Sequence, residues 1–199
     1  MATHYTASDA ANTAVRAFLT TVGEFYWGKQ FNNATGEAKI IWEGIRDNVF
    51  NGKCCYCGEK KDLTIEHLVM MSKEQYGLHH PGNIAPACRV CNRRTKNGDG
   101  KYFSWQETLK LVCSKRSEMD LYDARRQKIL DHVTKGRFAY PPLDESQRDS
   151  IRSIASEIYD ATKSVLDKSQ KRYFETVKDK RAERILASNR GQGSSVYLS

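Results

Sequence analysis

The first 52 residues carry apolar side chains at intervals of three and four, the spacing that places them on one face of a helix. One set predicts a helix near the start of the chain and consists of Val15, Phe18, Leu19 and Val22. A second set predicts a helix over 37–50, which the Asn51-Gly52 turn ends. Residues 1–52 are therefore expected to form a helical platform without chemistry of its own.

The last hundred residues show the same helical spacing. Ser104 and Glu107 form a capping box for one helix, and a second is expected over 118–132. After Pro141-Pro142, a long helix is expected over 144–189. Its predicted inward seam is Ile151, Ile154, Ile158, Ala161 and Val165. A heptad-like seam packs on the core, on a second copy in a homodimer or on another protein, so residues 102–199 are a helical region with these alternatives open.

The segment 53–101 lacks long helical periodicity and reads as strand, loop, strand and helix. A short strand is expected to end at Glu66-His67, and a return strand begins at Asn83 after a loop rich in structure breakers. A helix is then predicted from about Ala87. The fold class predicted for the chain is α+β and mostly helical, with a central ββα unit between helical flanks.

Four cysteines in this segment form two C-x-x-C pairs, Cys54 with Cys57 and Cys88 with Cys91. Two such pairs can close a tetrahedral Zn²⁺ site with no open position, which is a structural site. A disulfide pair or a redox dithiol is the alternative. Because no secretory signal is visible at the start, a reducing, cytoplasmic compartment is expected, where metal ligation by cysteine is favoured over disulfides.

The chain has a formal net charge of +8, which favours a polyanionic partner. The excess gathers at 88–101, where Asp99 is the one acidic residue beside five basic ones, Arg89, Arg93, Arg94, Lys96 and Lys101. Such a segment suits a phosphate backbone, although a solvated basic surface gives the same composition. No apolar run approaches the roughly 20 residues of a membrane span, so no membrane partner is expected.

The zinc pairs enclose a set of residues suited to phosphodiester hydrolysis. A histidine such as His67 can deprotonate water near neutral pH. Glu66 and Asn92 offer oxygen ligands of the kind that Mg²⁺ or Mn²⁺ prefers. Adjacent residues of a regular strand point to opposite faces, so Glu66 and His67 converge only if the strand ends or distorts there. Asn83 can hydrogen-bond across the loop and fix the orientation of His67.

In their order along the chain, these residues resemble the HNH endonuclease family, also called the ββα-metal or His-Me finger nucleases. The resemblance covers residues 53–99, from the first cysteine pair through Glu66-His67 and Asn83 to Cys88-Arg89-Val90-Cys91-Asn92. Two positions depart from the common pattern. Glu66 stands where aspartate is commoner, and Asn92 stands where many members have histidine.

The resemblance implies a role for each residue. His67 would activate the attacking water, Glu66 and Asn92 would hold one catalytic Mg²⁺ or Mn²⁺, and Asn83 would brace the loop. The phosphate contacts to double-stranded DNA would be Arg89, Arg93, Arg94 and Lys96. Small proteins of this family serve in restriction and antiphage defence, which is therefore the expected setting.

Two other functions remain open on the sequence. One is a zinc-stabilised module that binds nucleic acid without cutting it. The other is a nuclease subunit of a larger defence complex, docked through its helical flanks. The combination of Glu66, His67 and Asn92 favours an active nuclease, because a pure binding module has no need of a base and a metal site.

Overall fold

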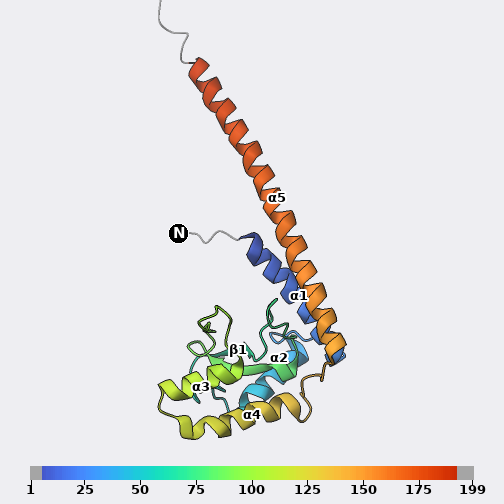
Figure 1. The fold of residues 1–199 in the computed structure, drawn as a ribbon, viewed down its shortest axis with the longest axis vertical. Coiled ribbons are helices and arrows are strands. Elements are labelled where there is room, and N and C mark those ends of the chain that lie inside the picture. The colour runs from blue at the N-terminus through green and yellow to red at the C-terminus, as the bar shows by residue number, and fades with distance from the viewer. Residues whose placement is uncertain (1–5, 192–199) are drawn as a thin grey trace, which may run out of the picture.

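The computed structural model describes residues 6–191, except for the side chains of residues 179 and 181–191. Figure 1 shows a body of short elements from which one long helix, α5 (Glu145–Gly191), projects. Helix α1 (Ala7–Trp27) lies against the body-proximal part of α5. The architecture is α+β and mostly helical, with one small sheet, so the predicted fold class is confirmed.

The helices begin and end where local sequence signals place them. Thr6 and Asp9 form a capping box at the start of α1, and Gly28 ends the helix with φ of 79°. The predicted capping box of Ser104 and Glu107 is confirmed at the start of α3. The remaining helical elements are α2 (Gly36–Gly44), the π-helix η1 (Ile45–Val49), α3 (Trp105–Lys115), the short 3₁₀ helix η3 (Met119–Leu121) and α4 (Tyr122–Thr134).

The sheet is a single antiparallel pair, β1 (Leu63–His67) with β2 (Ile84–Cys88). Its register places His67 opposite Ile84 and Leu63 opposite Cys88. A 3₁₀ turn, η2 (Pro81–Asn83), leads into β2. The hairpin therefore brings the last residue of β1, His67, beside the first residue of β2, with the loop 68–80 between them.

The helix predicted from about Ala87 is wrong. Strand β2 continues to Cys88, a turn follows, and the next helix is α3. One helix-like hydrogen bond forms, from the Asn92 backbone N–H to the Cys88 carbonyl at 2.9 Å. The chain then turns at Asn97 and Gly100. Because both thiols of the second pair must face the same point, this segment curls into a knuckle instead of a regular helix.

Two apolar clusters hold the body together. The larger one joins the cysteine pairs and β2 to α2, α3 and α4, and its fully buried members include Phe31, Tyr56, Ile84, Leu109 and Ile129. The smaller one joins α1 to α5 and to the loop between the strands through Val15, Leu19, Leu78, Ile151 and Ala155. The predicted segments 1–52, 53–101 and 102–199 share these clusters, and their boundaries stay a prediction.

The seam predicted for α5 differs from the observed one. Ile151 is buried as expected, but Ala155 is buried in place of Ile154, which is 43% exposed. Farther along, Val165 is 61% exposed. Both registers satisfy helical spacing, and packing against α1, the loop between the strands and the segment before α5 decides which one is buried. Within residues 6–191, none of the helices combines the length and apolar character that a membrane crossing requires.

Candidate metal centre and active site

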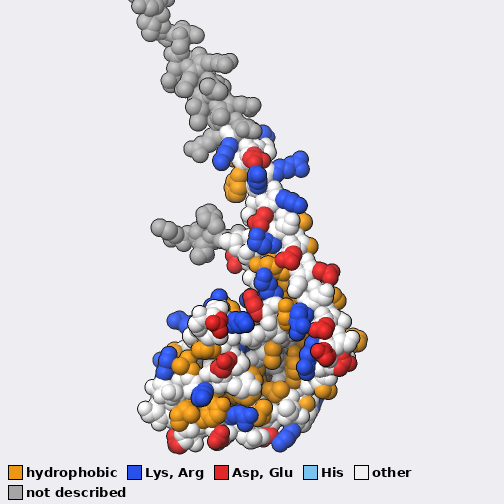
Figure 2. All heavy atoms as spheres, viewed as in Figure 1, with side chains coloured by type: hydrophobic (Ala, Val, Ile, Leu, Met, Phe, Trp, Pro, Cys, Tyr) orange, Lys and Arg blue, Asp and Glu red, His pale blue; other side chains and the backbone are white. Residues whose placement is uncertain are grey.

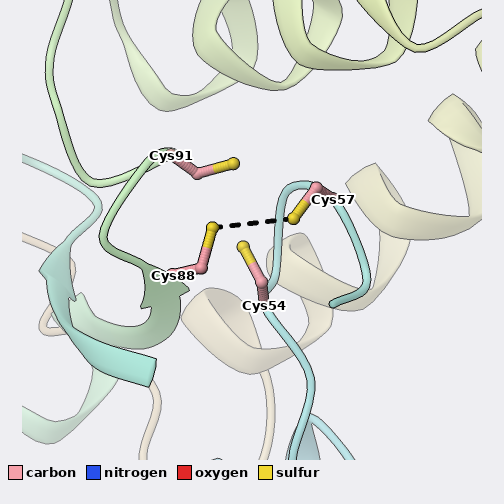
Figure 3. A group of neighbouring side chains, drawn as sticks. All are labelled: Cys54, Cys57, Cys88 and Cys91. Atoms are coloured by element: carbon pink, nitrogen blue, oxygen red, sulfur yellow. Dashed lines mark hydrogen bonds between the residues drawn. The ribbon is translucent and has the colours of Figure 1, made fainter. Parts of the chain in front are cut away.

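The four predicted ligand cysteines meet at one point. Figure 3 shows two thiols from the turn before β1 and two from the end of β2 and the knuckle after it, all directed inward. The four Sγ atoms lie within 4.8 Å of one another, and every one of these cysteines is buried. The Sγ atoms of Cys57 and Cys88 are 3.7 Å apart, close to the edge of about 3.8 Å expected for a zinc tetrahedron with Zn–S bonds of about 2.3 Å.

The backbone fixes the first cysteine pair in place. The Cys54 N–H donates to the Glu59 carbonyl at 2.8 Å, and the Cys55 N–H donates to the Pro86 carbonyl at 2.7 Å. The second bond ties the turn directly to β2. Cys55 is buried but is not among the four clustered thiols. The four clustered thiols are those of the two C-x-x-C pairs. The spacing within each pair identified them, because a C-x-x-C turn directs both thiols to the same side.

The four thiols interact closely enough to share protons. Hydrogen bonds with neighbouring thiols, chiefly Cys54, hold the pKa of Cys91 far above its usual value, with burial and charge repulsion acting in the same direction. Cys54 also raises the pKa of Cys57 to about 12. A divalent ion removes this repulsion by binding the thiolate form. The four buried cysteines thus fit a zinc ion, as the sequence predicts.

His67 is the last residue of β1, and its side chain contacts the loop between the strands. Its Nε2 atom lies 2.9 Å from Nδ1 of His79, a residue of the loop between the strands. Burial, aided by the nearby His79, Arg94 and Arg16, lowers the pKa of His67 to about 3. The imidazole is therefore neutral at neutral pH, which is the form that accepts a proton from water.

Glu66 points to the opposite face of β1 and is buried. Its Oε1 atom accepts a hydrogen bond from the Tyr56 hydroxyl at 2.9 Å and pairs with the Arg94 guanidinium. Burial raises the pKa of the Glu66 carboxyl, whereas Arg94 and Tyr56 act to lower it. The strand is regular at this point, so the carboxylate and the His67 ring do not meet directly.

Asn92 lies on the same face as Glu66. Its side-chain Nδ2 donates to Thr64 Oγ1 at 2.8 Å and to the Ile65 carbonyl at 2.9 Å. Thr64 and Glu66 share this face because they are two residues apart on β1. With both amide hydrogens used, the Asn92 oxygen is turned away from the strand. No described residue donates a hydrogen bond to that oxygen or to the second carboxylate oxygen of Glu66.

Asn83 braces the loop between the strands. Its Oδ1 atom accepts from the Val69 N–H at 2.8 Å, and its Nδ2 donates to the carbonyls of Val69 and Leu78 at 2.9 and 2.8 Å. Its own carbonyl accepts from the Leu68 N–H at 2.9 Å. These bonds hold both ends of the loop beside the last residue of β1. The role of Asn83 in orienting His67 stays a prediction.

The four predicted phosphate contacts divide into two groups. Arg89, Arg93 and Lys96 are exposed. Arg94 is not, because its side chain is 7% exposed and enters the body to reach Glu66 and the carbonyls of Leu68 and Phe103 at 3.1 Å each. Arg94 therefore does not fit its predicted role as a surface phosphate contact. Nothing in the local sequence separates it from Arg93, since only the fold decides which of two adjacent arginines turns inward.

Replacing Arg94 with methionine is expected to destabilise the protein strongly. The change leaves the Glu66 carboxylate buried without its partner, which costs about 3–5 kcal/mol in comparable pairs. Urea unfolding at pH 7.5 measures the loss, and the Glu66→Gln/Arg94→Met double variant should recover much of it. The exposed neighbour supplies the control, since Arg93→Met should change stability by less than about 0.5 kcal/mol. Equal effects at both arginines would contradict the assigned pairing.

A second buried histidine makes stability depend on pH. Burial, aided by His79 and His132, lowers the pKa of His80 to about 4, against about 6.5 in an unfolded chain. The unfolded state therefore binds the proton more tightly. The contribution of His80 to stability is full above about pH 6.5 and is lost as the pH falls toward the folded pKa, by about 2 kcal/mol at pH 5.0.

The His80→Asn variant tests this dependence. In the wild type, His80 Nδ1 accepts a hydrogen bond from the Gly82 N–H at 3.0 Å. The asparagine side chain keeps an acceptor for this N–H. Unfolding in urea at pH 7.5 and 5.0, with zinc supplied throughout, should show a pH-dependent loss about 2 kcal/mol smaller in the variant. Zinc loss in acid affects both proteins alike, so the difference between them isolates His80. The same loss in both proteins would show that His80 does not titrate between these states.

The hairpin carries four clustered cysteines at one end and a neutral histidine at the end of β1, with a carboxylate and an amide on the opposite face of that strand. Residues 54–98 match the family model described as HNH endonuclease, which supports a nuclease-type function in general. No curated protein and no solved structure matches the chain. The family match includes none of the flanking helices.

Proposed function

We propose that the protein is a metal-dependent HNH endonuclease that hydrolyses phosphodiester bonds of double-stranded DNA. The observation that carries the proposal is His67, a neutral imidazole at the end of a zinc-braced hairpin and held by a hydrogen bond at one ring nitrogen. The second ring nitrogen is left to act on a water. A correctly positioned general base contributes about 10²–10⁴-fold to a hydrolytic rate.

In this mechanism His67 removes a proton from the attacking water. The water oxygen then bonds to phosphorus, and the bond from phosphorus to the 3′ oxygen breaks. Asn83 keeps the His67 backbone and the adjoining loop in register. Glu66 and Asn92 would hold one Mg²⁺ or Mn²⁺, because each keeps an oxygen without a hydrogen-bond donor on the same face of β1. Such an ion supplies charge stabilisation for the phosphate and the leaving oxygen.

The DNA contacts proposed for this domain are Arg89, Arg93 and Lys96, which are exposed on and after the zinc knuckle. On the face shown in Figure 2, Lys and Arg side chains are interspersed with Asp and Glu. We therefore place the proposed phosphate contacts in the short basic segment on and after the knuckle. Six cysteines without a disulfide fit the proposed cytoplasmic location. A role in restriction or antiphage defence belongs to the proposal through the family resemblance alone.

Incubation with supercoiled plasmid tests the activity directly. Wild-type protein should convert the plasmid to nicked or linear DNA in Mg²⁺ or Mn²⁺. A brief treatment with a chelator at the start of the reaction should stop this cleavage. Zinc content measured after the chelator step separates loss of the catalytic ion from loss of the structural one. A plasmid that stays supercoiled in both metals, with zinc retained, would exclude this function.

A non-cleaving nucleic-acid-binding module is the second candidate, and the Arg94–Glu66 pair favours it. Arg94 already supplies a positive charge to the carboxylate that would bind the catalytic ion. Divalent ions would then compete with an internal cation, and binding would be weak. Mn²⁺ titration followed by calorimetry distinguishes the two candidates, because a binding module takes up no ion at Glu66 and a Glu66→Gln variant gives the same result as wild type.

A nuclease subunit of a larger complex is the third candidate. Helix α5 extends beyond α1 and exposes Val165, Tyr173 and Phe174, with exposed fractions of 61%, 65% and 58%. Such side chains on a projecting helix suit packing against another chain. Light scattering of the purified protein, alone and with the products of neighbouring genes, tests this proposal. A monomer that cuts DNA unaided would remove it.

A further inference from the structure

A second histidine is attached to the proposed general base. The rings of His67 and His79 have centroids 5.2 Å apart and are tilted by 50°, with Nε2 of one 2.9 Å from Nδ1 of the other. Two neutral imidazoles at this distance share one proton in a hydrogen bond, so one ring donates and the other accepts. Nε2 of His67 faces His79 in either case, so the direction of the bond determines whether Nδ1 of His67 carries a hydrogen or is free to accept one.

The amino-terminal helix holds His79 in place. The His79 backbone N–H donates to the Leu19 carbonyl of α1 at 3.3 Å. At Gly23, one turn farther along, a Cβ atom would lie 2.3 Å from the His79 carbonyl oxygen, so only glycine permits this approach. The Phe31 ring packs against the imidazole with centroids 5.1 Å apart. Both the backbone and the ring of His79 are therefore fixed by residues outside the matched domain.

The contact with His79 decides which nitrogen of His67 can act as the base. Because Nε2 of His67 faces His79 Nδ1, Nδ1 of His67 is the ring nitrogen that remains for a water. A neutral imidazole carries one hydrogen, so this Nδ1 can accept the proton of water only when the hydrogen is on Nε2. In that form, His67 Nε2–H donates to His79 Nδ1.

We propose that His79 is a positioning residue that holds His67 in the Nε2–H tautomer and so leaves Nδ1 as the base. The proposal rests on the proposed nuclease function, because the use of Nδ1 as the base gives the direction of the hydrogen bond. When His67 accepts the proton of water at Nδ1, its Nε2–H remains bonded to Nδ1 of the neutral His79 ring, so His67 keeps its orientation. The departing 3′ oxygen takes its proton from solvent. Helix α1 thereby serves the active site and is more than a packing platform.

A matched pair of variants at His79 tests the proposal. In His79→Asn the side-chain oxygen can occupy the position of Nδ1 and accept from His67. In His79→Gln the amide reaches the position of Nε2 instead, so the acceptor for His67 is lost while the polarity is kept. Both proteins are compared with wild type in their zinc-loaded form, with zinc content and circular dichroism as the checks of folding.

Nitrogen-15 NMR of the imidazoles gives the first readout, because long-range proton–nitrogen couplings distinguish the two tautomers. His67 should be in the Nε2–H form in wild type and in His79→Asn, and a mixture in His79→Gln. Single-turnover cleavage gives the second. The rate at saturating DNA should fall about 100-fold in His79→Gln and less than about 10-fold in His79→Asn, with DNA affinity unchanged in both.

The two readouts separate this inference from the proposed function. If wild type does not cut DNA but the His67 tautomer follows the acceptor at residue 79, the nuclease proposal fails and the positioning role stands. If His67 keeps the Nε2–H form in His79→Gln, the positioning role is overturned, whatever the cleavage rates. If either variant does not fold, the tautomer of His67 in wild type decides, and an Nδ1–H form there overturns the inference.

Discussion

Replacing Cys88 with serine is expected to remove zinc and unfold the hairpin. A structural zinc site contributes about 10–16 kcal/mol of binding free energy that is expressed as folding free energy, whereas a domain of this size is stable by about 5–15 kcal/mol in total. Cys88 ends β2 and points at the centre of the cluster (Figure 3). Metal analysis and circular dichroism of the purified variant measure both losses.

Cys55→Ser provides the matched control for that experiment. Cys55 is buried beside the cluster, and its pKa is raised well above the usual value by burial and by Cys54, so it remains a neutral thiol. The variant should retain one zinc per chain and its helical signal. A Cys88→Ser protein that is folded without metal, or a Cys55→Ser protein that loses zinc, would contradict the assignment of the four ligands.

Replacing His67 with alanine is expected to reduce the cleavage rate by about 10³-fold or more, near the limit of detection. The change removes the base and leaves the zinc ligands and the exposed arginines untouched. Zinc content, thermal unfolding and DNA affinity should therefore match wild type. Gel analysis of supercoiled plasmid under single-turnover conditions measures the rate, and filter binding measures the affinity at a stated salt concentration.

His132→Gln separates this effect from the general loss of a buried histidine. His132 lies in α4, and its Nε2 is 2.9 Å from the Ile84 carbonyl, a contact that the glutamine amide can reproduce. Cleavage by this variant should stay within a factor of about 3 of wild type, the range of a neutral substitution. Unchanged cleavage in His67→Ala would remove His67 from the mechanism and leave the non-cleaving module as the better description.

The order of the chemistry along the chain was predictable from short-range spacing. Two residues between paired cysteines produce a turn with both thiols on one side, and the adjacent Glu66 and His67 sit where a short apolar strand ends. The interaction of Asn83 with the loop also follows from its place at the start of the return strand. These features depend on contacts within a few residues, which the amino-acid order specifies directly.

The prediction of a helix from about Ala87 is wrong because contacts between distant segments outweigh the local sequence pattern. Cys88 and Cys91 must meet Cys54 and Cys57, and the chain bends to satisfy that geometry. The inward turn of Arg94, next to an exposed Arg93, has the same origin, since a buried carboxylate from β1 needs a positive partner. The spacing of residues within this segment predicts neither the bend after Cys88 nor the inward direction of Arg94.

By itself the sequence determined the zinc ligands, the mostly helical flanks and the identity of the residues around the hairpin, because each of these follows from local periodicity or ligand spacing. Tertiary structure alone decided that Arg94 pairs with Glu66, that Ala155 and not Ile154 faces α1, and that His79 meets His67. All three are contacts between segments distant along the chain, and they depend on how helices and strands pack. The close approach of Gly23 to His79 shows how one such packing contact brings the amino-terminal helix to the proposed base.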